Sequence, residues 1–229
     1  MEQISKNTVK GTNQLEESKY VRFDNIEGDG VKIMFVGNSI TLHGVKHEIG
    51  WHECFGMAAS SMENDYVHIC EREIQKEYPN AAFCICQVCE WETNYKSGEE
   101  KFYLYEKARE FNADIIIMRA VENCPRVDFD KEIFKREYDK LLKYLNTDGK
   151  AKIVLTTGFW KHIADDSIRE YSALQNLPLI ELGDLGEDDE MKAIGKFEHV
   201  GVANHPGDLG MKNIADRILD VIFTQFLGR

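Results

Sequence analysis

The sequence has little positive charge compared with its negative charge. It contains 28 lysine and arginine residues against 40 aspartate and glutamate residues, which gives a formal net charge of −12. A surface with this excess repels the phosphates of nucleic acids and the anionic headgroups of membranes. We therefore expect no nucleic acid and no membrane as partners, and a neutral or cationic small molecule suits the chain better.

Long apolar runs are also absent. No segment approaches the roughly 18 consecutive apolar residues of a membrane-spanning helix. The polar stretch of residues 1 to 19 lacks the apolar centre of a signal peptide, and its irregular pattern is typical of a flexible tail. The expected location is the cytoplasm.

The sequence lacks a metal-binding or nucleotide-binding pattern as well. The six cysteines fall mostly inside apolar runs, which argues for reduced thiols. No P-loop lysine pattern occurs. Two groups have suitable residue types but not the spacing of a metal site: Cys84, Cys86 and Cys89 along a predicted strand, and His43, His47 and His52 with no helical register. We expect no metal and no cofactor.

What the sequence does contain is a regular alternation of short apolar runs with stretches of helical spacing, and 43% of its residues are hydrophobic. This alternation predicts a five-stranded, mainly parallel sheet covered by helices on both faces, an α/β fold within a single domain of residues 1–229. A short edge strand can be added at residues 20–23. The predicted strands are 33–36, 82–88, 115–118, 152–156 and 177–182, and the predicted helices are 64–78, 99–111, 131–146, 165–176 and 207–226.

Three polar residues lie in loops at which such a sheet usually carries its binding and catalytic residues. Ser39 follows the strand at 33–36, because Gly37 permits a sharp exit from that strand. Asn123 lies past the third strand, where its amide can donate to an oxyanion. His205 precedes the last helix, and with an ordinary pKa of about 6.5 it suits a general base.

The aromatic residues near these loops have two open interpretations. Trp51 and Phe55 lie in a glycine-containing loop after Ser39, and Trp91 follows the second strand. These rings can form a surface on which a sugar stacks. Alternatively, they pack their loops onto the core.

The three loop residues carry a resemblance to the SGNH hydrolases, also called the GDSL esterase and lipase family. Gly37-Asn38-Ser39 resembles the block that holds the nucleophile, Asn123 resembles the asparagine block, and His205-Pro206 resembles the histidine block. The resemblance implies a flavodoxin-like three-layer α/β/α sandwich. It also implies that Ser39 is the nucleophile, that His205 is the base, and that the Ser39 N–H and Asn123 form the oxyanion hole.

The chain departs from the family pattern around the oxyanion hole. Val121 stands where a glycine usually precedes the asparagine, and residues 87–95 contain no glycine. A backbone N–H can replace the missing glycine, since any residue except proline donates one. The candidates for this donor are Val88, Cys89 and Glu90.

A second departure concerns the acid of the catalytic triad. The family usually has an aspartate three residues before its histidine, and this chain has Val202 there. The backbone carbonyl of Val202 is the preferred replacement, because it can accept the imidazole Nδ1–H and hold the useful tautomer. Glu198 is the second candidate.

These features together predict a serine esterase that hydrolyses small acyl esters, with acetyl the expected acyl group. The resemblance extends to carbohydrate esterases, so the alcohol part of the substrate can be a sugar. The alternative is a catalytically impaired SGNH-fold protein that binds a small molecule or carbohydrate, and the sequence leaves a homo-oligomer open.

Overall fold

A six-stranded sheet forms the centre of the computed structural model, which describes residues 19–228. The strands are β1 (Val21–Asp24), β2 (Lys32–Gly37), β3 (Ala82–Gln87), β4 (Ile115–Arg119), β5 (Lys152–Thr156) and β6 (Leu179–Ile180). The helices are α1 (Tyr66–Gln75), α2 (Cys89–Thr93), α3 (Glu106–Phe111), α4 (Lys131–Leu145), α5 (Asp165–Gln175), α6 (Val200–Ala203) and α7 (Asp208–Ile222). Except for Lys19, the predicted tail of residues 1–19 lies outside the described residues.

The order of the strands confirms the predicted parallel sheet and adds one strand to it. The sheet runs β1-β3-β2-β4-β5-β6, and all pairs from β3 to β6 are parallel. The added strand is β1, which pairs antiparallel with β3 and lies at the edge that we expected for residues 20–23. The sheet therefore has six strands where the sequence predicted five and a short edge strand.

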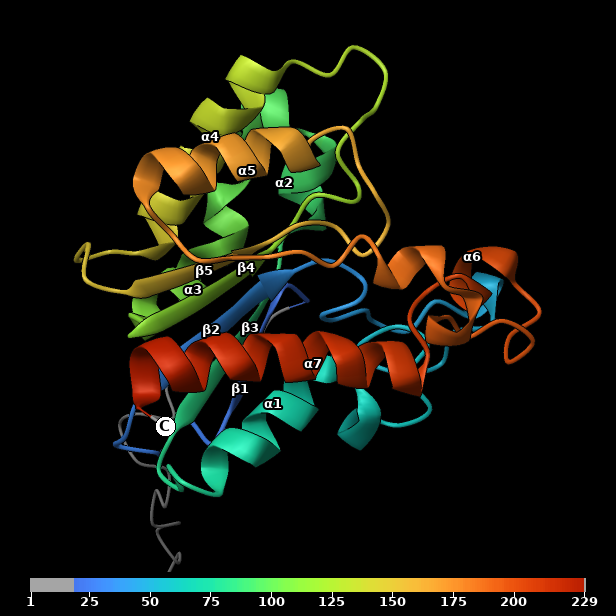
Figure 1. The fold of residues 1–229 in the computed structure, drawn as a ribbon, viewed down its shortest axis with the longest axis horizontal. Helices are drawn as coiled ribbons and strands as arrows, with labels where there is room; N and C mark the ends of the chain where they lie inside the picture. The colour runs from blue at the N-terminus through green and yellow to red at the C-terminus, as the bar shows by residue number, and fades with distance from the viewer. Residues whose placement is uncertain (1–18, 229) are drawn as a thin grey trace, which may run out of the picture.

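Helices cover both faces of the sheet, which gives three layers (Figure 1). Side chains alternate along β2, as the period of a strand requires. Ile33 and Phe35 face a buried cluster that includes α1 and α7. Met34 and Val36 face the opposite cluster, which includes α4 and the buried part of α5. Because both faces of the central strands are apolar, the sheet is buried on both sides.

Most helices follow the predicted pattern. For example, α4 begins after Asp130, whose side chain accepts from the Glu132 and Ile133 N–H groups as a cap. Three places differ from the prediction. The segment predicted as a helix at 99–111 divides into a 3₁₀ helix, Tyr95–Tyr105, followed by α3. The short helices α2 and α6 were not predicted, and both lie beside residues of the candidate site described below.

The part of the chain that the structure describes contains no helix with the length and apolar character needed to cross a bilayer.

All six cysteines are free thiols, as their positions in apolar runs predicted.

Candidate active site

Ser39 lies in a tight turn directly after β2. A Cβ atom at Gly37 would lie only 1.9 Å from Thr41 Oγ1, so this position requires glycine. The turn closes because the Asn38 carbonyl accepts from the N–H groups of Thr41 and Leu42, each at 2.9 Å. The Ser39 carbonyl in turn accepts from the Met57 N–H, at 2.8 Å. The turn therefore holds Ser39 at the carboxyl end of the parallel strands, partly exposed.

His205 reaches Ser39 from the turn between α6 and α7. Its Nε2 lies 2.8 Å from Ser39 Oγ. Its Nδ1 lies 2.7 Å from the carbonyl oxygen of Gly201, so the Nδ1–H donates to that oxygen. With Nδ1 protonated, Nε2 of the neutral ring carries the lone pair that accepts the Ser39 hydroxyl proton. The structure thus brings these two predicted site residues into direct contact.

The group that orients His205 differs from both predicted candidates. The Val202 carbonyl accepts the backbone N–H of His205, at 2.9 Å, and is not the acceptor of the imidazole. The Glu198 side chain is exposed, and no hydrogen bond joins it to His205 among residues 19–228. The prediction of Val202 or Glu198 is corrected to the Gly201 carbonyl. The physical reason is that α6 forms one helical turn, which directs the carbonyl four residues back toward the His205 ring.

The environment of His205 keeps its imidazole neutral. Burial lowers the pKa of His205 to about 4, although the hydrogen bond to the Gly201 carbonyl acts in the opposite direction. The positive charge of Arg119 and the nearby His43 ring also favour the neutral form, while Glu122 favours the protonated form.

Asn123 is linked to the serine turn through Glu92. The Asn123 Nδ2 donates to Glu92 Oε2 at 2.5 Å, and the Asn38 Nδ2 donates to Glu92 Oε1 at 2.9 Å. Glu92 comes from α2 and is fully buried. Burial and the nearby Glu122 carboxylate raise the pKa of Glu92 to about 7. One carboxyl group therefore holds the amides of both asparagines, one beside Ser39 and one past β4.

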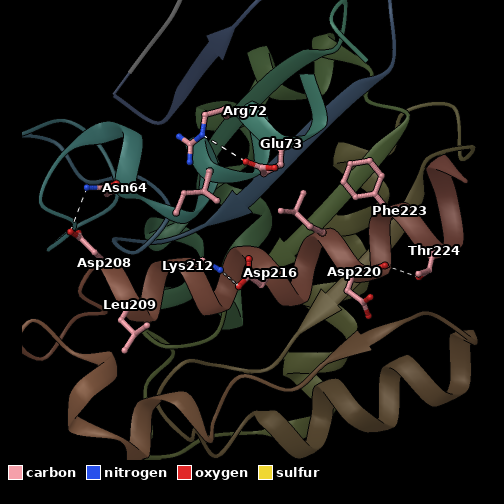
Figure 2. A pocket seen from close by; sticks show the side chains of 12 residues that line it. Asn64, Arg72, Glu73, Asp208, Leu209, Lys212, Asp216, Asp220, Phe223 and Thr224 are labelled. Carbon is pink, nitrogen blue, oxygen red and sulfur yellow. Dashed lines mark hydrogen bonds and ion pairs between the residues drawn. The ribbon is translucent and has the colours of Figure 1, made fainter. Parts of the chain in front are cut away.

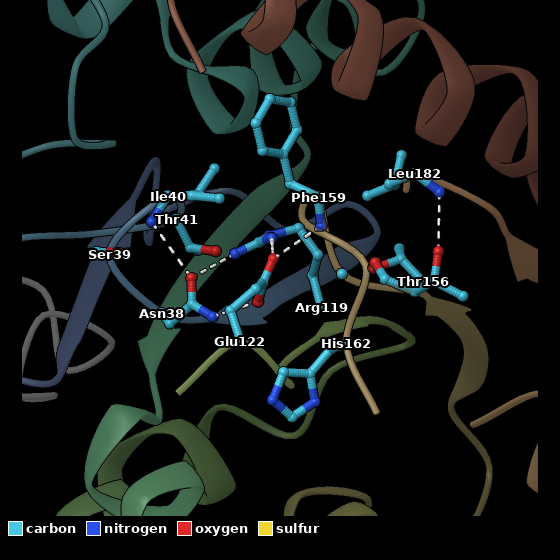
Figure 3. A network of polar contacts seen from close by, with 12 residues as sticks. Asn38, Ser39, Ile40, Thr41, Arg119, Glu122, Thr156, Phe159, His162 and Leu182 are labelled. Carbon is cyan, nitrogen blue, oxygen red and sulfur yellow. Dashed lines mark hydrogen bonds and ion pairs between the residues drawn. The ribbon is translucent and has the colours of Figure 1, made fainter. Parts of the chain in front are cut away.

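A buried ion pair completes this network (Figure 3). The Arg119 Nη1 donates to Glu122 Oε1 at 2.5 Å, and its Nη2 donates to Asn38 Oδ1. The Glu122 carboxylate also accepts from the Asn38 Nδ2, at 2.5 Å, and from the Phe159 N–H, at 3.0 Å. Burial favours protonation of Glu122, but the Arg119 guanidinium and the Phe159 N–H hold the pKa of that carboxyl below its ordinary value.

This network was not predicted from the sequence, although the sequence contains part of the signal for it. Arg119 ends the otherwise apolar run of β4, and Glu122 lies next to Asn123. A charged residue at the carboxyl end of a buried strand indicates a polar partner, because a buried charge without one is costly. Glu92 carried no comparable signal, since the short helix α2 was not predicted.

Two of the three predicted backbone donors after β3 already have acceptors. The Val88 N–H donates to the Gly37 carbonyl at 2.6 Å, and the Cys89 N–H donates to Gln87 Oε1 at 3.2 Å. The N–H groups of Glu90 and Ser39 have no acceptor within the described part of the chain. These two remain available as donors to a ligand.

Of the two interpretations of the aromatic residues, packing onto the core is correct and the sugar-stacking surface is wrong. Trp91 is fully buried, Trp51 is 2% exposed and Phe55 is 6% exposed. A different aromatic residue lies at the site: the Trp160 ring contacts the His205 ring edge-on, with centroids 5.0 Å apart. Trp160 is half-buried and follows β5, so the rule that located Ser39 could have found it as well.

A groove between α1 and α7 lies apart from this site (Figure 2). Its polar lining is largely paired, for example Asn64 with Asp208 and Lys212 with Asp216. None of the predicted site residues lines it.

Comparison with known proteins supports the fold alone. No protein-family model and no curated protein matches the sequence. Among solved structures, the psychrotrophic esterase EstA from Pseudoalteromonas sp., inhibited by monoethylphosphonate, has a TM-score of 0.58 at 12% identity, over 86% of this chain and 99% of that chain. A lipolytic protein of the G-D-S-L family from Veillonella parvula has a TM-score of 0.55 at 17% identity, over 86% of this chain and 100% of that chain.

A third similar structure is a two-domain esterase active on acetylated mannans, crystallised with mannopentaose. Its TM-score is 0.53 at 16% identity, over 84% of this chain and 49% of that one, so the present chain spans about half its length. The predicted α/β/α fold is confirmed, and it is the fold of GDSL and SGNH esterases.

Proposed function

We propose that the protein is a serine esterase that hydrolyses small acyl esters through an acyl-enzyme on Ser39. The observation that carries this proposal is the contact of 2.8 Å between Ser39 Oγ and His205 Nε2, with the opposite ring nitrogen held by the Gly201 carbonyl. A hydroxyl, a neutral base and a group that fixes the tautomer are the parts that nucleophilic catalysis by serine needs.

The reaction proceeds in two stages at this site. His205 Nε2 takes the Ser39 proton as Oγ attacks the ester carbonyl, and the Ser39 N–H and an Asn123 N–H stabilise the oxyanion. The tetrahedral species then expels the alcohol, which receives the proton from His205. Water, activated by the same nitrogen, attacks the acyl-enzyme and releases the acid.

Acetyl esters of carbohydrates are the proposed substrate class. The support is the fold shared with an esterase active on acetylated mannans and the half-buried Trp160 ring beside His205. An indole at this position offers a face or an edge for a sugar ring. The net charge of −12 favours a neutral ester over an anionic one.

The second candidate function is a binding protein with the same fold and impaired chemistry. The specific observation that favours it is the replacement of a triad carboxylate by a backbone carbonyl at His205. A carbonyl orients the ring but stabilises the imidazolium less than a carboxylate does.

Covalent labelling separates the two functions. A fluorophosphonate is incubated with the protein, and the modified peptide is identified by mass spectrometry. The esterase proposal expects one adduct, on Ser39, which the Ser60→Ala control retains because Ser60 is bonded to Asp208 and not to His205. Absence of an adduct on Ser39, together with no turnover of p-nitrophenyl acetate, favours the binding protein.

The pH profile of the esterase should extend unusually far into the acid range. The neutral imidazole of His205 is the active form, and a pKa lowered to about 4 keeps it neutral at lower pH than an ordinary histidine. The plot of kcat/KM for p-nitrophenyl acetate against pH should fall with a midpoint well below 6.5. Circular dichroism at each pH controls for unfolding, and a midpoint at or above 6.5 in folded protein contradicts the prediction.

Glu198→Gln should leave turnover unchanged, within about twofold, because the exposed Glu198 side chain does not orient His205. Steady-state kinetics of this variant are compared with those of Glu190→Gln, another exposed position. A decrease in kcat of about 10³-fold or more, with folding intact, would assign the orienting role to Glu198 and remove it from the Gly201 carbonyl.

A further inference from the structure

A second cluster of ionisable side chains joins the edge strand β1 to helix α1. Asp24 ends β1, and His68 and Glu71 lie on α1. One potential ligand atom from each residue lies within 4.8 Å of the other two. None of these three residues contacts Ser39 or His205, so the cluster is separate from the proposed active site.

Glu71 gives the strongest indication that this cluster binds something. Its side chain is only 7% exposed, and its Oε1 atom is buried without a hydrogen-bond partner among residues 19–228. Buried carboxylates in proteins are normally hydrogen-bonded, paired with a cation or bound to a metal.

His68 is oriented as a metal ligand would be. Its Nδ1 lies 2.8 Å from Asp65 Oδ1, so the Nδ1–H donates to that carboxylate and leaves the Nε2 lone pair directed away from it. Asp65 is itself fixed, because it accepts from the Gly56 N–H and the His68 N–H, each at 2.9 Å. A carboxylate that orients the second nitrogen of a histidine is the usual outer partner of a metal-binding histidine.

The spacing of His68 and Asp24 suits a shared ion better than a direct bond. His68 Nε2 lies 3.9 Å from Asp24 Oδ2, which is too far for a hydrogen bond. Two ligand atoms that each lie about 2.0–2.2 Å from one tetrahedral ion are separated by roughly 3.3–3.6 Å, so an approach of a few tenths of an ångström brings these two atoms onto one ion. Three carboxyl groups, those of Asp24, Asp65 and Glu71, also lie around this single imidazole.

We propose that Asp24, His68 and Glu71 bind one divalent transition-metal ion that joins β1 to α1. Zn²⁺ fits the donors best, because one imidazole nitrogen and two carboxylate oxygens leave a fourth, water-filled position in a tetrahedral site. Ca²⁺ and Mg²⁺ prefer oxygen ligands alone. The site was not expected from the sequence, since Asp24 is far from α1 along the chain and only the fold brings it there.

Zinc titration of the full-length protein tests this site directly. The protein is freed of metal with EDTA, dialysed, and titrated with zinc sulfate by calorimetry. Bound zinc is counted by mass spectrometry after gel filtration, and Tm is measured with and without zinc. The expected result is one ion per chain and a Tm that rises with zinc concentration, because the ion binds the folded state preferentially.

Variants assign the binding to this cluster. Glu71→Gln keeps the size of the side chain but removes an anionic ligand, so it should weaken the Kd for zinc by at least about tenfold. Glu73→Gln lies on the same helix, where Glu73 is partly exposed and paired with Lys76, and should leave the Kd unchanged. His52→Ala tests the exposed pair His47 and His52, whose Nδ1 atoms lie 2.7 Å apart.

Three results would overturn the proposal. The first is that the folded, unmodified protein binds no stoichiometric zinc when it is titrated. The second is a Kd that Glu71→Gln leaves unchanged, and the third is binding that only His52→Ala abolishes. In each case Glu71 is a buried carboxyl group of α1 that binds no ion.

Discussion

Ser39→Ala is expected to lower kcat/KM for p-nitrophenyl acetate by at least about 10⁴-fold. The change removes the hydroxyl proposed to form the acyl-enzyme, while the proposed oxyanion donors, the Ser39 N–H and Asn123, keep their places. The small activity that remains should therefore come from binding and from polarisation of the carbonyl. Purified protein and initial rates over a range of substrate concentrations give the measurement.

Two controls make the Ser39 result specific. Among residues 19–228 the Ser39 hydroxyl is hydrogen-bonded to His205 alone, so Ser39→Ala should change Tm little. Ser60→Ala, which removes a hydroxyl bonded to Asp208, should keep full activity. If Ser39→Ala retains activity within about tenfold of the unmodified protein, Ser39 is not the nucleophile.

Arg119→Met is expected to lower the free energy of unfolding by about 3–5 kcal/mol. Arg119 is 1% exposed, and its guanidinium is bonded to Glu122 and Asn38. Methionine fills similar volume but leaves the Glu122 carboxylate buried without its cation. Urea unfolding followed by circular dichroism, with the slope m compared between variants, measures the loss.

A double variant shows whether the uncompensated charge is the cause. Arg119→Met combined with Glu122→Gln removes both charges and should recover part of the lost stability, because a buried pair costs less to delete than to break. Arg72→Met, at a half-exposed arginine, should change stability by less than about 0.5 kcal/mol. A double variant that is less stable than Arg119→Met alone would contradict this explanation.

The sequence predicted most of the fold because both faces of the central strands are buried. Apolar runs such as Ile115–Arg119 then appear as strands, and the amphipathic helices between them have a clear period. The helix α2 escaped detection because it has only five residues, and no side chain caps its first turn. Its position depends on contacts such as the hydrogen bond from the Trp91 N–H to Tyr105, which a local pattern does not contain.

The sequence could predict those parts of the site that depend only on which loop a residue lies in. Ser39 and His205 lie in two loops at the edge of the sheet where ligands bind in this fold. Their close approach could therefore be predicted. The sequence left the aromatic residues with two interpretations, because residue type alone does not show which side of a loop faces the core. The charge of Arg119 at the end of β4 indicated a polar partner, but it did not identify Glu122, since that pairing depends on how the turn after β4 folds back on the strand.

The carbonyl of Gly201 has a consequence for how this protein can change during evolution. A carboxylate is lost by a single codon change, whereas every residue type at position 201 carries a carbonyl oxygen. A Cβ at Gly201 would meet only the His199 ring, whose Nδ1 accepts from the Val202 N–H as the cap of α6. The third member of the hydrogen-bond chain is thus encoded by the backbone path of α6 and not by the identity of any side chain. Sequences of this kind can lose the acid beside the histidine while keeping the arrangement, and a search that requires an acid three residues before the histidine would pass over them.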